Sequence, residues 1–447
     1  DPSLTKEQIL LHARHQFIEG DVLHWWHPPT DRGIRSRITD DLLWLPYVTA
    51  FYIAHTGDRS ILTEKMPFVK ARQLQEHEHE AYLQPETTEQ TASLYEHCCR
   101  AIDRSLTTGE HGLPLIGAGD WNDGMNKVGI EGKGESVWLG FFLYDILQSF
   151  IPICKRREDA ERVKTYTAYK KELKQHLNSE GWDGKWYRRA YYDDGTPLGS
   201  SQNEECRIDA IAQSWSAISG AGTPKKVKQA LQSADELLVS EPEGIIRLLT
   251  PAFDQTEKNP GYIKGYIPGV RENGGQYTHA ALWVVKAFAE HGNRERAAKL
   301  LRMLTPVNHA INSQDIDSYH VEPYAVAADI YGEDPLTGMG GWTWYTGSAG
   351  WMYRVMIESV LGLQIVKGDI LKVDPLISPN WKRYSITVRR LDSNTQYKVE
   401  VLNPEKRADG QLSATLDGEG IEVKKNIVKV KMTDDETTHT LKLEVTS

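Results

Sequence analysis

The stretch "SVWLGFFLYDILQSFIPIC", residues 136–154, decides the fold class of this 447-residue chain. It is apolar on nearly all sides, which is the pattern of a helix buried in a large core. Other long amphipathic stretches, separated by Gly- and Pro-rich loops, run from residue 1 to about residue 365. They indicate about ten helices with no strands alternating between them, so a parallel α/β sheet is not expected. The clearest are 91–106, 160–177, 206–219, 224–238, 278–291 and 348–363.

The tail of the chain changes its period. Apolar and polar residues alternate in 384–391, 396–403, 427–432 and 439–445, with turns between them, as in β-strands. We therefore predict a mainly α fold, with a helical domain at residues 1–367 and a small antiparallel β-sandwich at residues 368–447. Ten to twelve amphipathic helices with functional loops between them also suggest helical hairpins closed into an α/α barrel.

The composition limits the partners of this protein. Its net charge is -10, which excludes nucleic acid as a bulk electrostatic partner because phosphate-backbone binding needs concentrated Lys and Arg. A few local groups could still hold one small phosphate. No apolar run reaches 18 residues and no signal peptide is recognised, so a membrane span is not expected. The four cysteines form no CxxC pair, and we expect reduced thiols in a cytoplasmic protein rather than a zinc site or disulfides.

The loop "GLPLIGAGDWNDGMNKVG", residues 112–129, combines two aspartates with a tryptophan. Its five glycines are too dense for a helix, since each interior Gly costs about 1 kcal/mol relative to Ala. The chain has 13 tryptophans, and flat amphipathic rings in loops suit stacking on sugars, although a core position is an equal alternative for any single one. The loop is therefore either a turn or a site.

Three more loops share this character: 20–46, 268–283 and 338–351. Their Trp and Asp residues suit sugar hydroxyls and acid catalysis. Their Arg, His and Thr residues, with free amides at helix starts, suit an anion. Cleavage of a glycosidic bond needs an acid and a nucleophile from the opposite face. A hydrolase needs a second carboxylate to activate water, whereas a phosphorylase uses a bound phosphate instead.

Three stretches resemble other sites but have a simpler explanation. "EHEHE" (76–80) alternates His and Glu on a polar loop, which favours a solvated surface over a metal site. "GIEGKGES" (129–136) does not satisfy the pattern G-x-x-x-x-G-K-[ST] of a phosphate loop. "QDIDSYHVEPY" (314–324) lacks a fixed ligand spacing, so a polar wall of the pocket is favoured. We predict no metal and no organic cofactor, with inorganic phosphate as co-substrate.

The loops at 20–53, 111–129, 271–283 and 342–351 together resemble glycoside hydrolase family 94, a family of inverting disaccharide and oligosaccharide phosphorylases. The resemblance covers essentially the whole chain. It implies an (α/α)6 catalytic barrel followed by a C-terminal β-sandwich. Members also carry an N-terminal β-sandwich and linker helices that this chain lacks, so we expect a missing N-terminal region. Family members are commonly dimers, which makes a homodimer an open alternative.

The resemblance also implies roles for single residues. Asp123 matches the general acid, and Trp121 the wall of the subsite for the non-reducing glucose. Asp120 is expected to be structural. Arg35 resembles the phosphate-binding arginine and Asp41 the carboxylate that grips the glucose, with Arg37 and Asp40 as the neighbouring alternatives. Three residues of this chain resemble the remaining phosphate ligands of the family: His279, Thr346 and Gly347. We expect further substrate contacts from Glu272, Glu322 and Tyr324.

The function implied is reversible, inverting phosphorolysis of a β-linked gluco-oligosaccharide to α-glucose 1-phosphate and a shortened glucan. We expect Asp123 to be kept protonated by a partly apolar, Trp-lined pocket. Ala328 stands where cellobiose-type members have a Gln, and residues 78–106 look more like the β-1,2-glucan branch. The alternatives are a cellobiose- or laminaribiose-type phosphorylase, an inverting hydrolase using Asp123 with Glu272 or Glu322, and a non-catalytic glucan-binding fragment.

Overall fold

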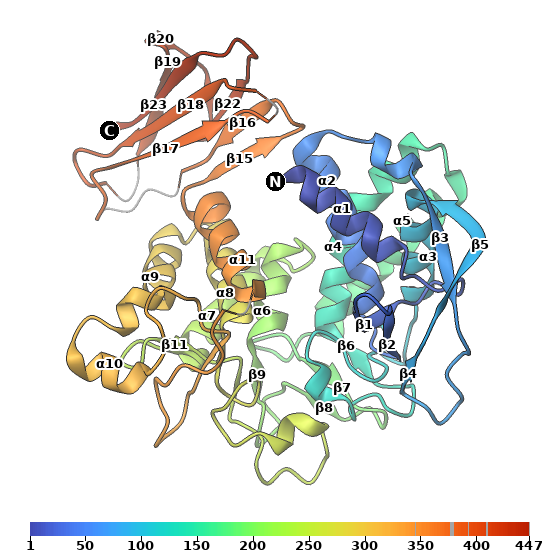
Figure 1. The fold of residues 1–447 in the computed structure, drawn as a ribbon. Helices are drawn as coiled ribbons and strands as arrows, with labels where there is room; N and C mark the ends of the chain where they lie inside the picture. The colour runs from blue at the N-terminus through green and yellow to red at the C-terminus, as the bar shows by residue number, and fades with distance from the viewer. Residues whose placement is uncertain (345, 376–379, 392, 408–409, 447) are drawn as a thin grey trace.

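The computed structural model describes residues 1–344, 346–375, 380–391, 393–407 and 410–446. Within this part of the chain, eleven α-helices are followed by two β-sheets, which lie at one end of the helical part next to α11 (Figure 1). Each helix predicted from the sequence is present. The helices are α1 (Pro2–Ala13), α2 (Trp44–Thr56), α3 (Leu94–Ser105), α4 (Val137–Arg156), α5 (Ala160–Ser179), α6 (Ala210–Ile218), α7 (Pro224–Leu238), α8 (Thr278–Glu290), α9 (Arg294–Leu304), α10 (Ser313–Tyr319) and α11 (Thr346–Arg354).

Helix α4, which contains the apolar stretch quoted first, forms the centre of the core. It is long and apolar enough to cross a membrane, but 72% of its most apolar 18-residue window is buried inside the protein, against α2, α5 and α6. Its aromatic residues pack with those of α6 and α8: the ring of Trp138 lies 6.2 Å from the rings of both Trp215 and Trp283. These three tryptophans are fully buried, so they stabilise the core and do not bind sugar.

The helices are arranged in two rows. In the inner row α2 contacts α4, α4 contacts α6, α6 contacts α8, and α8 contacts α11. Helices α3, α5, α7 and α9 each pack against one of the first four. The guanidinium of Arg354, at the end of α11, lies 4.0 Å from the ring of Phe51 in α2, so the row returns toward its start. The described helices supply five members of the inner row, whereas an (α/α)6 barrel has six.

The helical part also contains short strands, which is a correction to the strand-free pattern expected. Several pairs are only two residues long, too short to give any periodicity in the sequence. Three of them directly precede the inner helices: β6 before α4, β9 before α6 and β13 before α8. They therefore fix the loops at the N-terminal ends of these helices. The sheets in this part are β1 (Leu23–His27) with β2 (Arg32–Ser36) and β4 (Glu80–Leu83); β3 (Lys65–Lys70) with β5 (Glu86–Ser93); β6 (Glu135–Ser136) with β7 (Ala190–Tyr191) and β8 (Pro197–Leu198); β9 (Ile208–Asp209) with β12 (Leu249–Thr250); β10 (Val239–Ser240) with β11 (Ile245–Ile246); and β13 (Gln276–Tyr277) with β14 (Asp329–Ile330).

The C-terminal part consists of a four-stranded and a five-stranded sheet with one shared core. The four strands predicted for the tail are present as β17, β18, β22 and β23. Strands β18 and β23 are parallel, with Val399 opposite Leu441, and the other pairs are antiparallel. In order across each sheet, the strands are β15 (Leu363–Val366), β16 (Ile370–Val373), β22 (Ile427–Lys431) and β21 (Val423–Lys424), and then β17 (Arg383–Arg389), β18 (Gln396–Leu402), β23 (Thr438–Thr446), β19 (Gln411–Leu416) and β20 (Glu419–Gly420).

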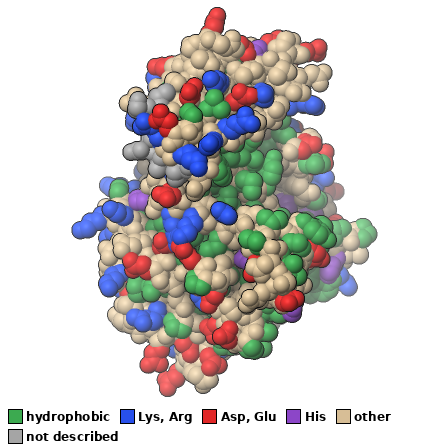
Figure 2. All heavy atoms as spheres, turned by 90° about the vertical axis from the view of Figure 1, so that its left-hand side faces the viewer, with side chains coloured by type: hydrophobic (Ala, Val, Ile, Leu, Met, Phe, Trp, Pro, Cys, Tyr) green, Lys and Arg blue, Asp and Glu red, His purple; other side chains and the backbone are tan. Residues whose placement is uncertain are grey.

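The junction between the helices and the sheets is well defined. The β15–β16 hairpin spans the division predicted at residue 367, which stays a prediction, and its turn docks on α2 through Lys367 N–H and the Ala54 carbonyl. Arg294 of α9 donates to Asp374 at 2.9 Å. Figure 2 shows charged side chains of both signs spread over one face and hydrophobic side chains gathered below the C-terminal sheets. The two parts are therefore joined by polar contacts beside an apolar patch.

Candidate active site

The loop at residues 112–129 is held by a buried ion pair at Asp120. Both oxygens of this carboxylate accept hydrogen bonds from Arg189, at 2.7 and 2.5 Å, and Ser136 Oγ donates to it at 2.6 Å. The backbone N–H of Asn122 donates to the same carboxylate at 3.2 Å. The side chains of Asp120 and Arg189 are completely buried. Asp120 is thus the structural aspartate of the loop, as predicted.

A second contact joins this loop to residues 36–41. Thr39 N–H donates to the Gly119 carbonyl at 3.0 Å, and Ile38 and Gly117 form an antiparallel bridge. Gly117 has a φ of +59°, and a Cβ there would lie 2.4 Å from the Arg37 carbonyl oxygen. Only glycine fits this close approach. The two loops are therefore fastened together, which brings Asp41 and Asp123 to one site.

Asp123 begins the short 3-10 helix Asp123–Met125, and its side chain is 40% exposed. Burial raises the pKa of this carboxyl, but the polar contacts with His24 and Tyr262 and the charge of Arg271 together bring the pKa below its usual value. The expectation that an apolar pocket keeps Asp123 protonated is therefore wrong for the unliganded chain. The carboxylate is ionised because it has a cationic neighbour.

That neighbour is His24 of β1, which the sequence reasoning did not identify. Its Nδ1 lies 3.0 Å from both oxygens of Asp41, and its Nε2 lies 3.7 Å from Asp123 Oδ2. The contacts with Asp123 and Asp41 raise the pKa of His24 to about 10, against the opposing effect of burial. The choice between Asp40 and Asp41 is also decided, because Asp40 is buried and accepts from Trp44 Nε1 at 3.0 Å.

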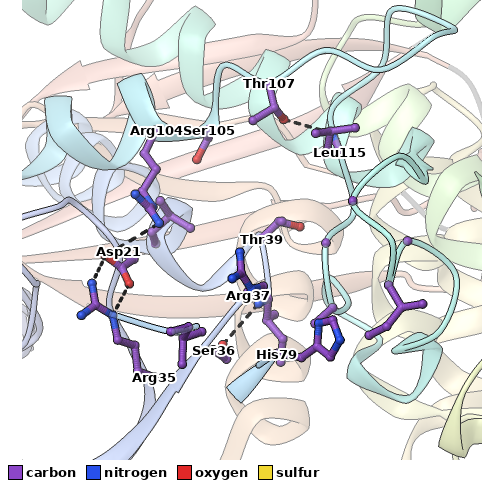
Figure 3. A pocket seen from close by; sticks show the side chains of 18 of the residues that line it. Asp21, Arg35, Ser36, Arg37, Thr39, His79, Arg104, Ser105, Thr107 and Leu115 are labelled. Carbon is purple, nitrogen blue, oxygen red and sulfur yellow. Dashed lines mark hydrogen bonds and ion pairs between the residues drawn. The ribbon is translucent and has the colours of Figure 1, made fainter. Parts of the chain in front are cut away.

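Arg35 lies elsewhere. Its side chain is 2% exposed, donates to both oxygens of Asp21 at 2.7 and 2.9 Å, and reaches Glu19 at 3.1 Å (Figure 3). The reason is the alternation of side chains along β2: Ser36 Oγ lies 3.3 Å from Asp41, so its neighbour Arg35 points to the other face. Arg35 and Arg37 line a separate cavity of about 740 Å³ together with Asp21, His79 and Arg104.

A cluster of aromatic rings lies beside the Asp123 loop. Trp121 packs edge-on against His279, with 5.4 Å between the ring centroids, and His279 stacks on Trp351 of α11 at 5.6 Å. The Nε2 atom of His279 is buried and has no hydrogen-bond partner in the described structure. Burial lowers the pKa of His279 to about 3, so the imidazole is neutral. This ring therefore carries a polar atom that the described residues leave without a hydrogen bond.

The first turn of α11 is the second half of the predicted anion site. Gly347 is exposed, and a Cβ at this position would meet nothing within 4 Å. The turn carries free backbone N–H groups, which suit an anion. Trp351, which stacks on His279, lies one turn further along the same helix. Thr346 begins the helix, and its side chain lies outside the described part of the structure.

Glu272 and Arg271 form a further charged pair near Asp123. Glu272 is 8% exposed and lies 3.3 Å from Arg271 Nε. Burial raises the pKa of Glu272, and the charge of Asp123 adds to this effect while Arg271 opposes it. The Arg271 guanidinium lies 4.4 Å from the ring of Trp342. Glu272, one of the predicted substrate residues, is therefore close enough to Asp123 for the charge of that carboxylate to raise its pKa.

Glu322 and Tyr324 lie at an exposed aromatic rim. Trp344 Nε1 donates to Glu322 at 3.3 Å, and Tyr324 is 75% exposed against the same indole, with 6.2 Å between the rings. The chain as described shows no contact of either residue with Asp123.

The loop at residues 129–136 binds a carboxylate of the protein itself. The backbone N–H groups of Lys133 and Gly134 both donate to Asp193 at 2.9 Å. Within the described residues, no group of three metal-ligating side chains occurs.

Comparison with known proteins shows the family of this chain. Residues 1–362 match the family described as "Glycosyl hydrolase 94 superfamily, catalytic domain". The chain is 49% identical to the cyclic beta-(1,2)-glucan synthase NdvB of Rhizobium meliloti (strain 1021), over 92% of this chain and 14% of that protein. It is 30% identical to the solabiose phosphorylase of Paenibacillus borealis, over 94% of this chain and 51% of that one.

A more distant relative is the 1,2-beta-oligoglucan phosphorylase of Listeria innocua serovar 6a, 23% identical over 84% of this chain and 36% of that protein. The chain thus spans about one seventh of the synthase and about half of the solabiose enzyme. Because the family match covers more than three quarters of the sequence, from residue 1 to residue 362, this chain belongs to the glycosyl hydrolase 94 superfamily.

Proposed function

We propose that this chain catalyses the inverting phosphorolysis of β-linked gluco-oligosaccharides, with β-1,2-glucan favoured, to α-glucose 1-phosphate and a shortened glucan. One observation carries the proposal: the buried Nε2 atom of the neutral His279 has no hydrogen-bond partner among the described residues, and its ring stacks on Trp351 of α11 beside the loop of the acid Asp123. Phosphate bound there by His279 and the Gly347 amide is held by donors and by the positive end of a helix.

In this mechanism the glucose unit lies between the phosphate and Asp123. Trp121 forms a wall of its subsite, because its ring packs against His279 and it precedes Asp123 by two residues. Asp41 and Glu272 bind sugar hydroxyls. Phosphate attacks the anomeric carbon while Asp123 gives a proton to the leaving oxygen, and the configuration inverts. The reverse reaction elongates the glucan.

The preference for β-1,2-glucan rests on the relatives. NdvB and the Listeria enzyme are both named for β-1,2-linked glucans, and the first of them is 49% identical to this chain. Ala328 is consistent with this preference, since its side chain is buried where cellobiose-type members carry a Gln. We further propose that the inner row of helices belongs to the (α/α)6 barrel typical of the family, that the protein acts in the cytoplasm, and that it acts as a homodimer.

The test is the dependence of cleavage on phosphate. The purified chain is incubated with β-1,2-gluco-oligosaccharides, cellobiose and laminaribiose, with and without inorganic phosphate, and glucose 1-phosphate and free glucose are measured separately. We expect glucose 1-phosphate only when phosphate is present, with β-1,2-linked substrates fastest. Free glucose without phosphate would support the hydrolase, with Glu272 as its base.

The acid is tested by replacing Asp123 with asparagine. General acid catalysis contributes about 10²–10⁴-fold, so D123N should lose that factor on glucan. The matched control is Asp194→Asn, a carboxylate whose side chain is 61% exposed and pairs with Lys258. Near-full phosphorolysis by D123N would refute the assignment of Asp123. Binding of glucan without any cleavage by the unmodified chain would indicate the non-catalytic fragment.

A further inference from the structure

His24 is placed by an irregularity in its strand. Strands β1 and β2 pair Leu23 with Arg35 and Trp25 with Ile34, so His24 has no opposite residue and forms a bulge. Bulges next to active sites re-aim a side chain. Here the bulge directs the imidazole out of the sheet pattern and between Asp41 and Asp123. The bulge therefore determines the position of the His24 ring.

The two sides of the ring are held differently. Nδ1 is 3.0 Å from both oxygens of Asp41, whose carboxylate is also 3.3 Å from Ser36 Oγ. Nε2 is 3.7 Å from Asp123, slightly beyond hydrogen-bond distance. The His24 side chain is 26% exposed and that of Asp123 is 40% exposed, so Asp123 is the more accessible of the pair. Asp41 thus fixes the ring, while the contact with Asp123 can open and close.

Other charged and titratable groups also act on this pair. On the side of Asp123 they are Tyr262, Arg271 and Glu272, and on the side of Asp41 the neighbour is Asp40. Two further imidazoles, His12 and His15, line the same cavity of about 510 Å³ as His24 and Asp41. Burial and the proximity of His15 lower the pKa of His12, so His12 does not compete with His24 for the proton.

We propose that His24 is a positioning residue that stores the proton Asp123 delivers during phosphorolysis. This inference rests on the proposed function and adds a proton path to it. His24 carries the proton on Nε2 in the unliganded chain, next to the ionised Asp123. When glucan occupies the site and displaces water, the proton passes from Nε2 to Asp123 Oδ2, which makes both groups neutral.

The proton balance of the step is complete. The Asp123 O–H bond breaks as the proton moves to the leaving glucan oxygen, and the glycosidic C–O bond breaks as a phosphate oxygen bonds to the anomeric carbon. The leaving glucan ends as a neutral hydroxyl. Hydrogen phosphate loses its own proton on becoming a glycosyl ester, and that proton returns the Asp123–His24 pair to its starting state. In synthesis each transfer runs backward.

Deprotonation of the Asp123–His24 pair determines the pH above which phosphorolysis is lost. The pair keeps its proton until His24 itself deprotonates, far above the range in which an isolated carboxylic acid is protonated. Without His24, Asp123 must hold the proton alone, close to the charge of Arg271 and the hydroxyl of Tyr262. The alkaline limb of the rate profile must then move to lower pH. The ionisation of free phosphate is shared by all variants and cancels in the comparison.

The experiment measures kcat/KM for phosphorolysis of β-1,2-gluco-oligosaccharide from pH 5 to pH 10 in the unmodified chain, in His24→Gln and in the control His27→Gln, an exposed histidine on the same strand. We expect H24Q to lose about ten- to hundredfold at pH 8, less than the full general acid effect of about 10²–10⁴-fold because Asp123 is still present, and its alkaline limb to fall by at least about one pH unit. H27Q should follow the unmodified chain.

A second substrate distinguishes a loss of proton supply in H24Q from a general structural defect. An aryl β-glucoside with an acidic phenol as leaving group needs little protonation, so H24Q should cleave it with phosphate within about threefold of the unmodified rate. Equal losses on both substrates, or an unmoved alkaline limb, would overturn the proposal. If the unmodified chain cleaves glucan without phosphate, the proposed function fails, while the comparison of the alkaline limbs still decides the role of His24.

Should H24Q not fold, the ¹⁵N-histidine NMR spectrum of the unmodified chain tests the proposal instead. The imidazole of His24, distinguished from that of His439 by the spectrum of His439→Gln, must stay charged above pH 8, and the absence of that charge would overturn the proposal.

Discussion

Replacing Arg189 with methionine should destabilise the protein and loosen the loop that carries Asp123. Arg189 is completely buried and donates to both oxygens of Asp120. Its Nε lies 3.4 Å from Asp209, whose carboxylate also accepts from the Ile211 N–H at the start of α6. The R189M variant keeps much of the side-chain volume and removes the cation. Two buried carboxylates then lose the positive charge that compensates them.

The size of the effect follows from the burial. Removing one partner of a buried ion pair costs about 3–5 kcal/mol because the other charge remains in the interior. Unfolding entropy of about 2.1 cal/mol/K per residue gives roughly 0.76 kcal/mol/K for a cooperative unit the size of the family match, so Tm should fall by about 4–7 °C. A loop displaced by about 1 Å can also lower turnover by about 10²-fold at temperatures where the variant is folded.

The pH dependence gives a second check with a definite sign. Burial raises the pKa of Asp209 to about 6, while Arg189 opposes this rise. In R189M the pKa of Asp209 rises further. A carboxyl whose folded pKa lies above its unfolded pKa loses stability as pH increases between the two values. The Tm deficit of R189M should therefore be larger at pH 8 than at pH 5.

The assay is calorimetry or circular dichroism of R189M and the unmodified chain at pH 5, 6.5 and 8, with turnover measured well below Tm. Arg188→Met is the matched control, because Arg188 pairs with Asp183 at 2.8 Å but its side chain is 18% exposed. R188M should lose less stability. A Tm of R189M within 1 °C of the unmodified value at pH 8, or a deficit that does not change with pH, would refute the reasoning.

Three further substitutions test the two ends of the site. His279→Asn should raise the KM for phosphate by about tenfold or more, since a hydrogen bond to a charged group contributes about 1.5–3 kcal/mol, and initial rates at varied phosphate would show an unchanged KM if His279 binds no anion. Gly347→Ala should leave Tm equal or slightly higher, because Ala favours a helix by about 0.5–1 kcal/mol, yet raise the KM for phosphate. A lowered Tm, or an unchanged KM, would count against an open amide there. Tyr324→Ala should raise the KM for long glucans without changing Tm or the KM for phosphate, since this side chain is 75% exposed. Equal glucan kinetics would remove Tyr324 from the substrate site.

The helices and the tail strands could be predicted because their periods are local. The spacing of apolar residues in 136–154 or 160–177 depends only on the geometry of one helix, and the same holds for alternation in strands such as β18. Strands of two residues, including β6, β9 and β13, show no period at all. They form because distant segments meet, and the sequence has no local sign of that meeting.

Within the candidate site, too, the sequence could predict only those features that depend on local sequence. The structural role of Asp120 could be predicted from its loop, while the roles of Asp123, Trp121 and Gly347 stay predictions from the family resemblance. The place of Arg35 could not be predicted, because one residue of alternation on β2 decides whether a side chain contacts Asp41, as Ser36 does, or Asp21, as Arg35 does. His24 stood in a motif that the sequence analysis quoted, but a bulge that depends on the pairing of β1 with β2 aims its ring.

By itself the sequence determined that this is a helical protein with a β-rich tail, and it predicted a site in four loops with one of the paired aspartates as its acid. Only the tertiary structure decided the charge of that acid. A pKa depends on distances of a few ångströms between groups from different loops, here His24, Asp123 and Arg271, and such distances exist only after the chain has folded. The contact between Asp123 and a cationic histidine is therefore a property of the fold.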